Sequence, residues 1–182
     1  MKSLADMSLG ELAAFVWTHL HRHGINCVLT GGACVSIYTT GCYQSYDLDF
    51  VERVPSSRKR IREALVELGF FEESRYFKHP ETKFFLEFPA GPLSVGSEPV
   101  KATVTLEFPT GQPALLSPTD CVKDRLAAYY HWNDQQSLEQ TLLVAQSNRI
   151  DIGEVRRWSD EEGKLTEFET IKQQLLARRN RP

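Results

Sequence analysis

One short stretch, residues 27–51, constrains the fold more than any other part of this chain. Cys27-Val28-Leu29 is an apolar run that ends close to Gly31-Gly32, which predicts a buried strand leading into a glycine turn. Residues 33–38 then predict a short helix. Residues 46–51 alternate polar with apolar side chains and therefore predict a second strand.

The second predicted strand carries two aspartates, Asp47 and Asp49. Because side chains alternate along a strand, both carboxylates leave the same face, about 6–7 Å apart along the chain direction. Two such carboxylates repel each other unless they are solvated or neutralised. Mg²⁺ prefers oxygen ligands and keeps waters and substrate phosphates among them. We therefore interpret the pair as ligands of Mg²⁺ or Mn²⁺, although Asp-x-Asp alone is more typical of a solvent-facing strand edge.

The glycine pair strengthens this interpretation. Glycines at Gly31 and Gly32 let backbone N–H groups approach phosphates closely, and the following helix directs its positive end toward them. A Gly-Gly pair alone indicates only a turn. Followed at once by a short helix and the Asp-x-Asp strand, it predicts a site for phosphate groups.

Hydrophobic periodicity, capping residues and turn residues predict the remaining elements. These are a helix from Ser8 to Gly24, a helix from Ser56 to Gly69, a hairpin over residues 70–88 with its second arm at 83–88, a strand at 102–108, and helices starting at Ser117 and covering 137–148, 152–158 and 165–177. The prediction is an α+β fold with an α/β-type core. The core spans residues 1–112, and a C-terminal helical region, residues 113–182, packs on it.

Composition limits the class of protein. A chain of 182 residues with 41% hydrophobic and 25% charged residues has enough material for a hydrophobic core. A net charge of −3 gives no basic footprint for nonspecific binding of nucleic acid. No apolar run approaches a membrane span and no signal peptide is evident, so we expect a cytoplasmic protein with no membrane partner. The four cysteines form no CxxC pair and are expected to be free thiols.

Three segments resemble the signature of the nucleotidyltransferase superfamily, the polymerase-β-like fold. They are Leu29-Thr30-Gly31-Gly32, Tyr38-Thr39-Thr40-Gly41 and Ser45-Tyr46-Asp47-Leu48-Asp49-Phe50. Within the superfamily, the chain resembles minimal bacterial members, the abortive-infection (AbiEii-type) nucleotidyltransferase toxins, over roughly residues 10–165. The resemblance implies a mixed, twisted sheet flanked by helices, an NTP such as ATP as substrate, and Mg²⁺ or Mn²⁺ as cofactor.

The resemblance also implies a third carboxylate on a later strand, which joins Asp47 and Asp49 in binding metal and in catalysis. Glu87 fits this position because it lies on the arm expected after the intervening helix and hairpin, and Glu107 is the alternative. The chain departs from the toxin-like pattern at residues 42–44, where such members often place an arginine.

The resemblance further assigns residues that would bind the nucleotide. Gly31, Gly32 and Ser36 would hold the triphosphate, and the downstream helix would direct Lys123 or Arg125 toward its phosphates. Lys123 and Arg125 are two apart, so they cannot share one helix face. Their charges are equally consistent with local ion pairs within the helices.

The implied activity is metal-dependent transfer of a nucleoside monophosphate from an NTP to an acceptor hydroxyl. The acceptor stays open between tRNA, a protein and a small molecule, and a toxin of this type would have an antitoxin partner. The alternative is a catalytically silent nucleotide-binding or regulatory module with the same fold.

Three histidines, His19, His21 and His23, crowd the end of the first predicted helix. The spacing of His19 and His23 suits a metal, but no acidic or cysteine partner accompanies them in sequence. We therefore interpret them as residues favoured near a helix C-terminus.

Overall fold

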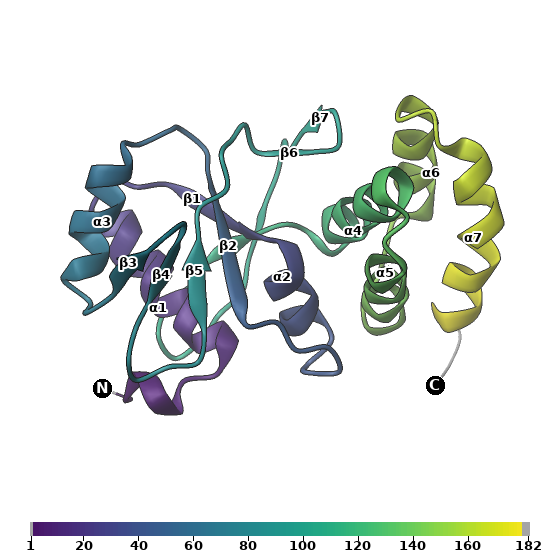
Figure 1. The fold of residues 1–182 in the computed structure, drawn as a ribbon. Coiled ribbons are helices and arrows are strands. Elements are labelled where there is room, and N and C mark those ends of the chain that lie inside the picture. Colours follow the sequence, from purple (N-terminus) through teal and green to yellow (C-terminus); the bar gives the residue numbers. More distant parts are fainter. Residues whose placement is uncertain (1, 180–182) are drawn as a thin grey trace.

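A seven-stranded mixed sheet forms one half of the molecule, and helices form the other half, in the computed structural model of residues 2–179 (Figure 1). The strand order is β3-β4-β5-β2-β1-β9-β8. These strands are β1 (Cys27–Thr30), β2 (Asp47–Glu52), β3 (Phe71–Glu73), β4 (Tyr76–Lys78), β5 (Phe85–Glu87), β8 (Val104–Thr105) and β9 (Ala114–Leu115). A separate hairpin pairs β6 (Ser94–Val95) with β7 (Glu98–Pro99). The predicted α+β class is confirmed.

The helices divide between the two halves (Figure 1). On the sheet side are α1 (Leu9–Arg22), α2 (Gly31–Tyr38) and α3 (Arg58–Val66), together with the short 3₁₀ helix η1 (Leu4–Asp6). The other half contains α4 (Pro118–Trp132), α5 (Gln135–Ser147), α6 (Ile152–Glu161) and α7 (Leu165–Arg179). Because α2 contacts β1 and β2 on one side and α4 and α5 on the other, it joins the two halves.

Local sequence signals explain where the helices begin. At α1, the Ser8 hydroxyl accepts a hydrogen bond from the Glu11 N–H, and the Glu11 carboxylate accepts one from the Ser8 N–H, which is a complete capping box. Gly24, with φ of +70°, follows the last turn. At α4, Ser117 caps the helix and Pro118 occupies its first turn, as predicted.

The structure differs from the prediction in several places. The first arm of the hairpin predicted over residues 70–88 is two paired strands, β3 and β4, and the β6–β7 hairpin was not predicted. The predicted strand at 102–108 is reduced to β8, residues 104–105, because only these two residues pair with β9. The strand β9 was missed in the sequence, since two residues carry no periodic signal; it lies at 114–115 and pairs in parallel with β1. The short helix begins at Gly31 itself and not at residue 33.

The hydrophobic core runs through both halves of the molecule. Leu48 and Phe50 of β2 are fully buried in it, as are Leu86 of β5 and Trp158 of α6. Within the described part of the chain, no helix combines the length and apolar character needed to cross a lipid bilayer.

Candidate active site

The two aspartates lie on β2 near the middle of the sheet. This strand pairs antiparallel with β1 and parallel with β5, so that it is held on both sides. Leu48 and Phe50 are fully buried, whereas Asp47 and Asp49 are half-buried on the opposite face. Burial of the apolar pair fixes the register, because a slip by one residue would place two carboxylates in the core.

A third carboxylate stands directly beside Asp49. Glu87 ends β5, and its Cα is paired with that of Asp49 in the parallel register of β5 and β2. Side chains that are paired in this way leave the same face of a sheet. Glu107, the alternative, is exposed and follows β8 at the far edge of the sheet. The structure therefore brings Glu87, and not Glu107, to the aspartates.

Gly31 makes room for the Asp49 carboxylate. Its φ of +66° lies in the left-handed region, and a Cβ at this position would collide with Asp49 Oδ2. A side chain would therefore be strained and would also strike the carboxylate. A Cβ on Gly32 would come within 2.9 Å of Ser45 Oγ. Both glycines place the N-terminus of α2 against the acidic groups, where backbone N–H groups and the helix dipole favour anions.

Ser45 and Ser36 set the loop that leads into β2. The Ser45 hydroxyl donates a hydrogen bond to Asp47 Oδ1, and the Ser45 N–H donates to Ser36 Oγ at 2.7 Å. Ser36, which was predicted to bind the triphosphate, thus orients Ser45 and, through it, Asp47. Its role toward a nucleotide stays a prediction.

Asp49 carries the strongest electrostatic signal in the site. Burial, together with the neighbouring carboxylates of Asp47 and Glu87, raises the pKa of Asp49 from 3.8 to about 7. Arg125 acts in the opposite direction and lowers this pKa. Two further anions beside a buried carboxyl group create a site that a cation would stabilise. Carboxylate oxygens are the ligands that Mg²⁺ and Mn²⁺ prefer. The oxygens of these three described carboxylates do not all lie within 4.8 Å of one another, so a shared ion would draw the side chains together.

The two predicted cations of α4 point to different places. Arg125 lies near Asp49, donates to Asp124 Oδ2 at 2.6 Å, and reaches Gln140 Oε1 at 3.5 Å. Lys123 is buried in a separate network, where its ammonium group is 3.0 Å from an Asp120 oxygen and 3.1 Å from a Glu154 oxygen. Of the two, only Arg125 is among the charges that shift the pKa of Asp49.

Several residues of the site were missed in the sequence. Burial and the nearby Asp47 charge raise the pKa of the Tyr43 phenol. Arg75, in the turn between β3 and β4, places its Nε 3.2 Å from Glu87 Oε1. Gln140 comes from α5. Of these missed residues, only Ser45 could have been predicted from the sequence, because it immediately precedes Tyr46-Asp47 in the motif.

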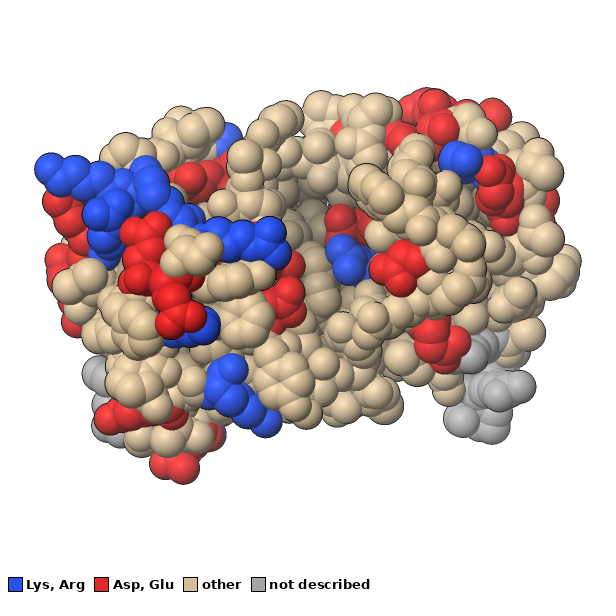
Figure 2. All heavy atoms as spheres, viewed as in Figure 1, with Lys and Arg blue, Asp and Glu red and all other residues tan. Residues whose placement is uncertain are grey.

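The face that carries these groups is concave. Figure 2 shows the surface hollowed between the sheet half and the helical half, with acidic and basic side chains close together in the hollow. A separate cavity of about 910 Å³ shares Ser36 and Tyr43 with the site and extends to Lys83 and Phe108. Among the described residues, none of the three carboxylates lines this cavity, so it adjoins the acidic groups without containing them.

Comparison with known proteins identifies the fold. The structure is similar to an antigenic nucleotidyltransferase-like protein from Paracoccidioides brasiliensis, with a TM-score of 0.58 and 15% sequence identity over 75% of each chain. It is also similar to the antibiotic-resistance factor ANT(2'')-Ia, with a TM-score of 0.50 and 12% identity over 93% of this chain and 95% of the other. No protein-family profile matches the chain. No curated protein matches its sequence. The chain has a nucleotidyltransferase fold.

Proposed function

We propose that this protein is a metal-dependent nucleotidyltransferase that transfers a nucleoside monophosphate from an NTP to an acceptor hydroxyl. The observation that carries the proposal is the position of Asp49. It is half-buried on β2, lies beside Asp47 and Glu87, and is packed against Gly31 at the N-terminus of α2. A carboxylate cluster next to the positive end of a helix suits a divalent cation and the phosphates bound to it.

Each residue has a proposed task in the reaction. Asp47, Asp49 and Glu87 would hold the divalent ions, which supply charge stabilisation for the attacking and leaving oxygens. The backbone N–H groups at Gly31 and Gly32 would orient the triphosphate. Glu87 would accept the proton of the acceptor hydroxyl as its oxygen forms a bond to the α-phosphorus and the bond to pyrophosphate breaks.

Arg125 supports the phosphates in this proposal. It is the α4 cation close enough to lower the pKa of Asp49, and a guanidinium group offers donors in the planar geometry that suits phosphate oxygens. Lys123 has no such task here, because it lies in a separate network with Asp120 and Glu154.

The acceptor is proposed only by class: a tRNA, a protein or a small hydroxyl compound. Surface charge does not favour extended RNA contacts. Three of the four basic residues of α3 are paired with acids, since Arg58 and Arg62 both contact Glu72 and Lys59 lies 3.8 Å from Glu63. Figure 2 shows blue and red side chains intermingled over this region. A small acceptor in the 910 Å³ cavity beside Ser36 and Tyr43 is compatible with the usual size of ligand pockets.

The toxin role with an antitoxin partner rests on the sequence resemblance alone. It predicts that expression of the protein arrests growth of a bacterial host, and that Asp49→Asn relieves the arrest. Arrest by the Asp49→Asn variant would assign toxicity to something other than nucleotidyl transfer.

The test of the proposal is a transfer assay with α-labelled NTPs and Mg²⁺ or Mn²⁺. Bulk tRNA, lysate protein and a panel of small hydroxyl compounds are offered separately, so that the labelled product reveals both the nucleotide and the acceptor class. The comparison is between the wild type, Asp49→Asn and the matched control Glu107→Gln, which removes an exposed acid far from the site.

We expect label transfer by the wild type and Glu107→Gln, and none above background by Asp49→Asn. Equal transfer by all three proteins contradicts the assignment. Metal-dependent NTP binding without transfer to any acceptor would favour the alternative, a silent nucleotide-binding module.

A further inference from the structure

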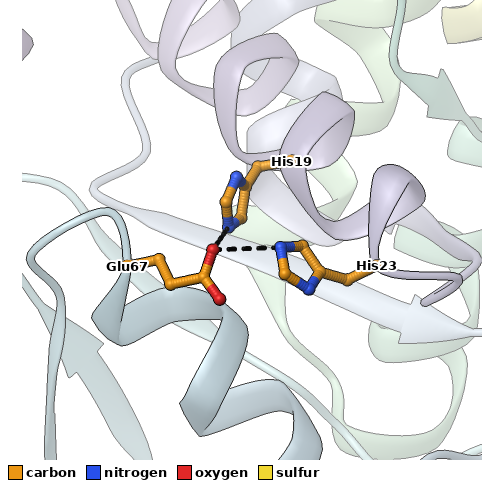
Figure 3. A group of neighbouring side chains, drawn as sticks. All are labelled: His19, His23 and Glu67. Atoms are coloured by element: carbon orange, nitrogen blue, oxygen red, sulfur yellow. Dashed lines mark ion pairs between the residues drawn. The ribbon is translucent and has the colours of Figure 1, made fainter.

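Outside the active site, three metal-ligating side chains gather at the end of α1. His19 lies in the last turn of α1, His23 caps its C-terminus, and Glu67 caps the C-terminus of α3. Figure 3 shows both imidazole rings directed toward the Glu67 carboxylate. Glu67 Oε2 is 3.2 Å from His23 Nε2 and 3.5 Å from His19 Nε2.

We propose that His19, His23 and Glu67 form a transition-metal site that binds Zn²⁺ and links α1 to α3. Four ligands at about 2.0–2.1 Å from a tetrahedral zinc ion lie about 3.3 Å from one another. The two distances from Glu67 are close to this value, and the ligand atoms of all three residues lie within 4.8 Å of one another. Among the described residues, this is the only group of three that satisfies that distance.

The surroundings favour a cation that can enter from solvent. Two helix C-termini meet here, and each presents the negative end of its dipole. Arg60 already donates a hydrogen bond to the His23 carbonyl at 2.5 Å, which places one positive group at this end of α1. The side chains of His23 and Glu67 are 36% and 57% exposed. The fourth ligand position therefore opens to water.

The donor set separates this site from the active site. Two imidazoles and one carboxylate suit Zn²⁺, whereas Mg²⁺ prefers oxygen ligands. The His19 Nε2–H donates to the Ala64 carbonyl at 2.9 Å. Zinc would replace that proton, so the site exchanges a hydrogen bond between α1 and α3 for a coordinate bond between the same helices.

The test is zinc binding by the full chain without a histidine tag. The parent protein carries Asp47→Asn and Asp49→Asn, which removes the acidic pair of the active site as a second place for zinc. Titration calorimetry with ZnCl₂ alone should give one equivalent bound. At a hundredfold excess over its dissociation constant, zinc should raise the melting temperature by about 5–10 °C, and MgCl₂ should leave it unchanged.

Variants identify the ligands. Glu67→Gln and His23→Ala should each weaken zinc binding at least tenfold, in line with the loss of one ligand of three. His21→Ala is the matched control, because His21 lies on the same turn but stacks on Trp17 with ring centroids 4.8 Å apart. It should bind zinc like the parent. Glu67 is more than half exposed, so weaker binding by Glu67→Gln is not a consequence of unfolding.

Two results would overturn the proposal. One is no measurable zinc binding by the parent, and the other is binding that Glu67→Gln and His23→Ala leave unchanged. Either result would identify the cluster as an ion-pair group between α1 and α3. The proposed transfer reaction uses different residues and is unaffected by the outcome.

Discussion

Asp49→Asn should stabilise the metal-free protein while it abolishes activity. The pKa of Asp49 is about 7 in the folded chain against an ordinary value of 3.8, so it stands about three units high. Each unit corresponds to 1.36 kcal/mol, so keeping Asp49 ionised costs the folded state up to about 4 kcal/mol at pH 8. Partial solvation of this half-buried side chain reduces the expected gain to about 2–4 kcal/mol.

The pH dependence has a defined sign. Between pH 3.8 and 7 the folded chain binds more protons at Asp49 than the unfolded chain does, so this residue's contribution to stability falls as pH rises and levels off above pH 7. The asparagine side chain of the variant does not titrate. The stability difference between the Asp49→Asn variant and the wild type should therefore be largest at pH 8 and fall to about 0.5 kcal/mol at pH 4.

Urea unfolding in EDTA at pH 4 and pH 8 measures this difference. At pH 8 the variant should also melt about 5–15 °C higher. Glu107→Gln is the control, and its exposed position should keep its effect within about 0.5 kcal/mol at both pH values. An Asp49→Asn variant that is no more stable than wild type at pH 8 would refute the account of a carboxylate confined beside two others.

Substitutions at three other positions of the site have distinct expected effects. Gly31→Ala should lower transfer at least tenfold and lower the free energy of unfolding by more than about 2 kcal/mol, because backbone strain adds to the collision with Asp49. Gly41→Ala, with φ of +87° and open space around it, should lower the free energy of unfolding only by the strain of about 1–2 kcal/mol in the same assay. Equal losses for the two variants would contradict the packing of Gly31. Glu87→Gln should lower kcat by about 10²-fold or more, and Glu107→Gln should leave it unchanged in the transfer assay; the reverse result would move the third carboxylate to Glu107. Arg125→Met should raise the pKa of Asp49, because Arg125 lowers it, so the acid limb of the pH profile of kcat/KM should move to higher pH. Lys123→Met should lower the free energy of unfolding by about 3–5 kcal/mol, because it removes the partner of Asp120 and Glu154, and should leave that limb in place.

Local signals were sufficient to predict much of the fold. The capping box at Ser8 and the Ser117-Pro118 start of α4 act within one turn of helix, so the sequence around them contains all the necessary information. The alternation around Leu48 and Phe50 likewise indicated which face of β2 is buried. The pairing of β9 with β1 has no such local signal, because it depends on residues far apart in the chain.

The site was predictable only in part, for the same reason. The order of elements indicated Glu87, but its register with Asp49 is a property of the assembled sheet. Helix geometry showed that Lys123 and Arg125 diverge, yet only the packing of α4 against α2 determines that Arg125 comes close enough to Asp49 to lower its pKa.

The acidic partner of the histidines is remote in sequence. Sequence inspection found no acid accompanying His19 and His23. The structure supplies Glu67, from the end of a different helix, 3.2 Å from His23. A ligand set of this kind becomes visible only when α1 and α3 are packed together.

The most direct measurement of the central claim is a crystal structure of the protein with Mn²⁺ and a non-hydrolysable NTP, with anomalous diffraction used to locate the metal. The account predicts an anomalous peak bound by carboxylate oxygens of Asp47, Asp49 and Glu87, with the triphosphate beside Gly31 and Gly32. A nucleotide-bound Mn²⁺ that none of these three carboxylates contacts would contradict it.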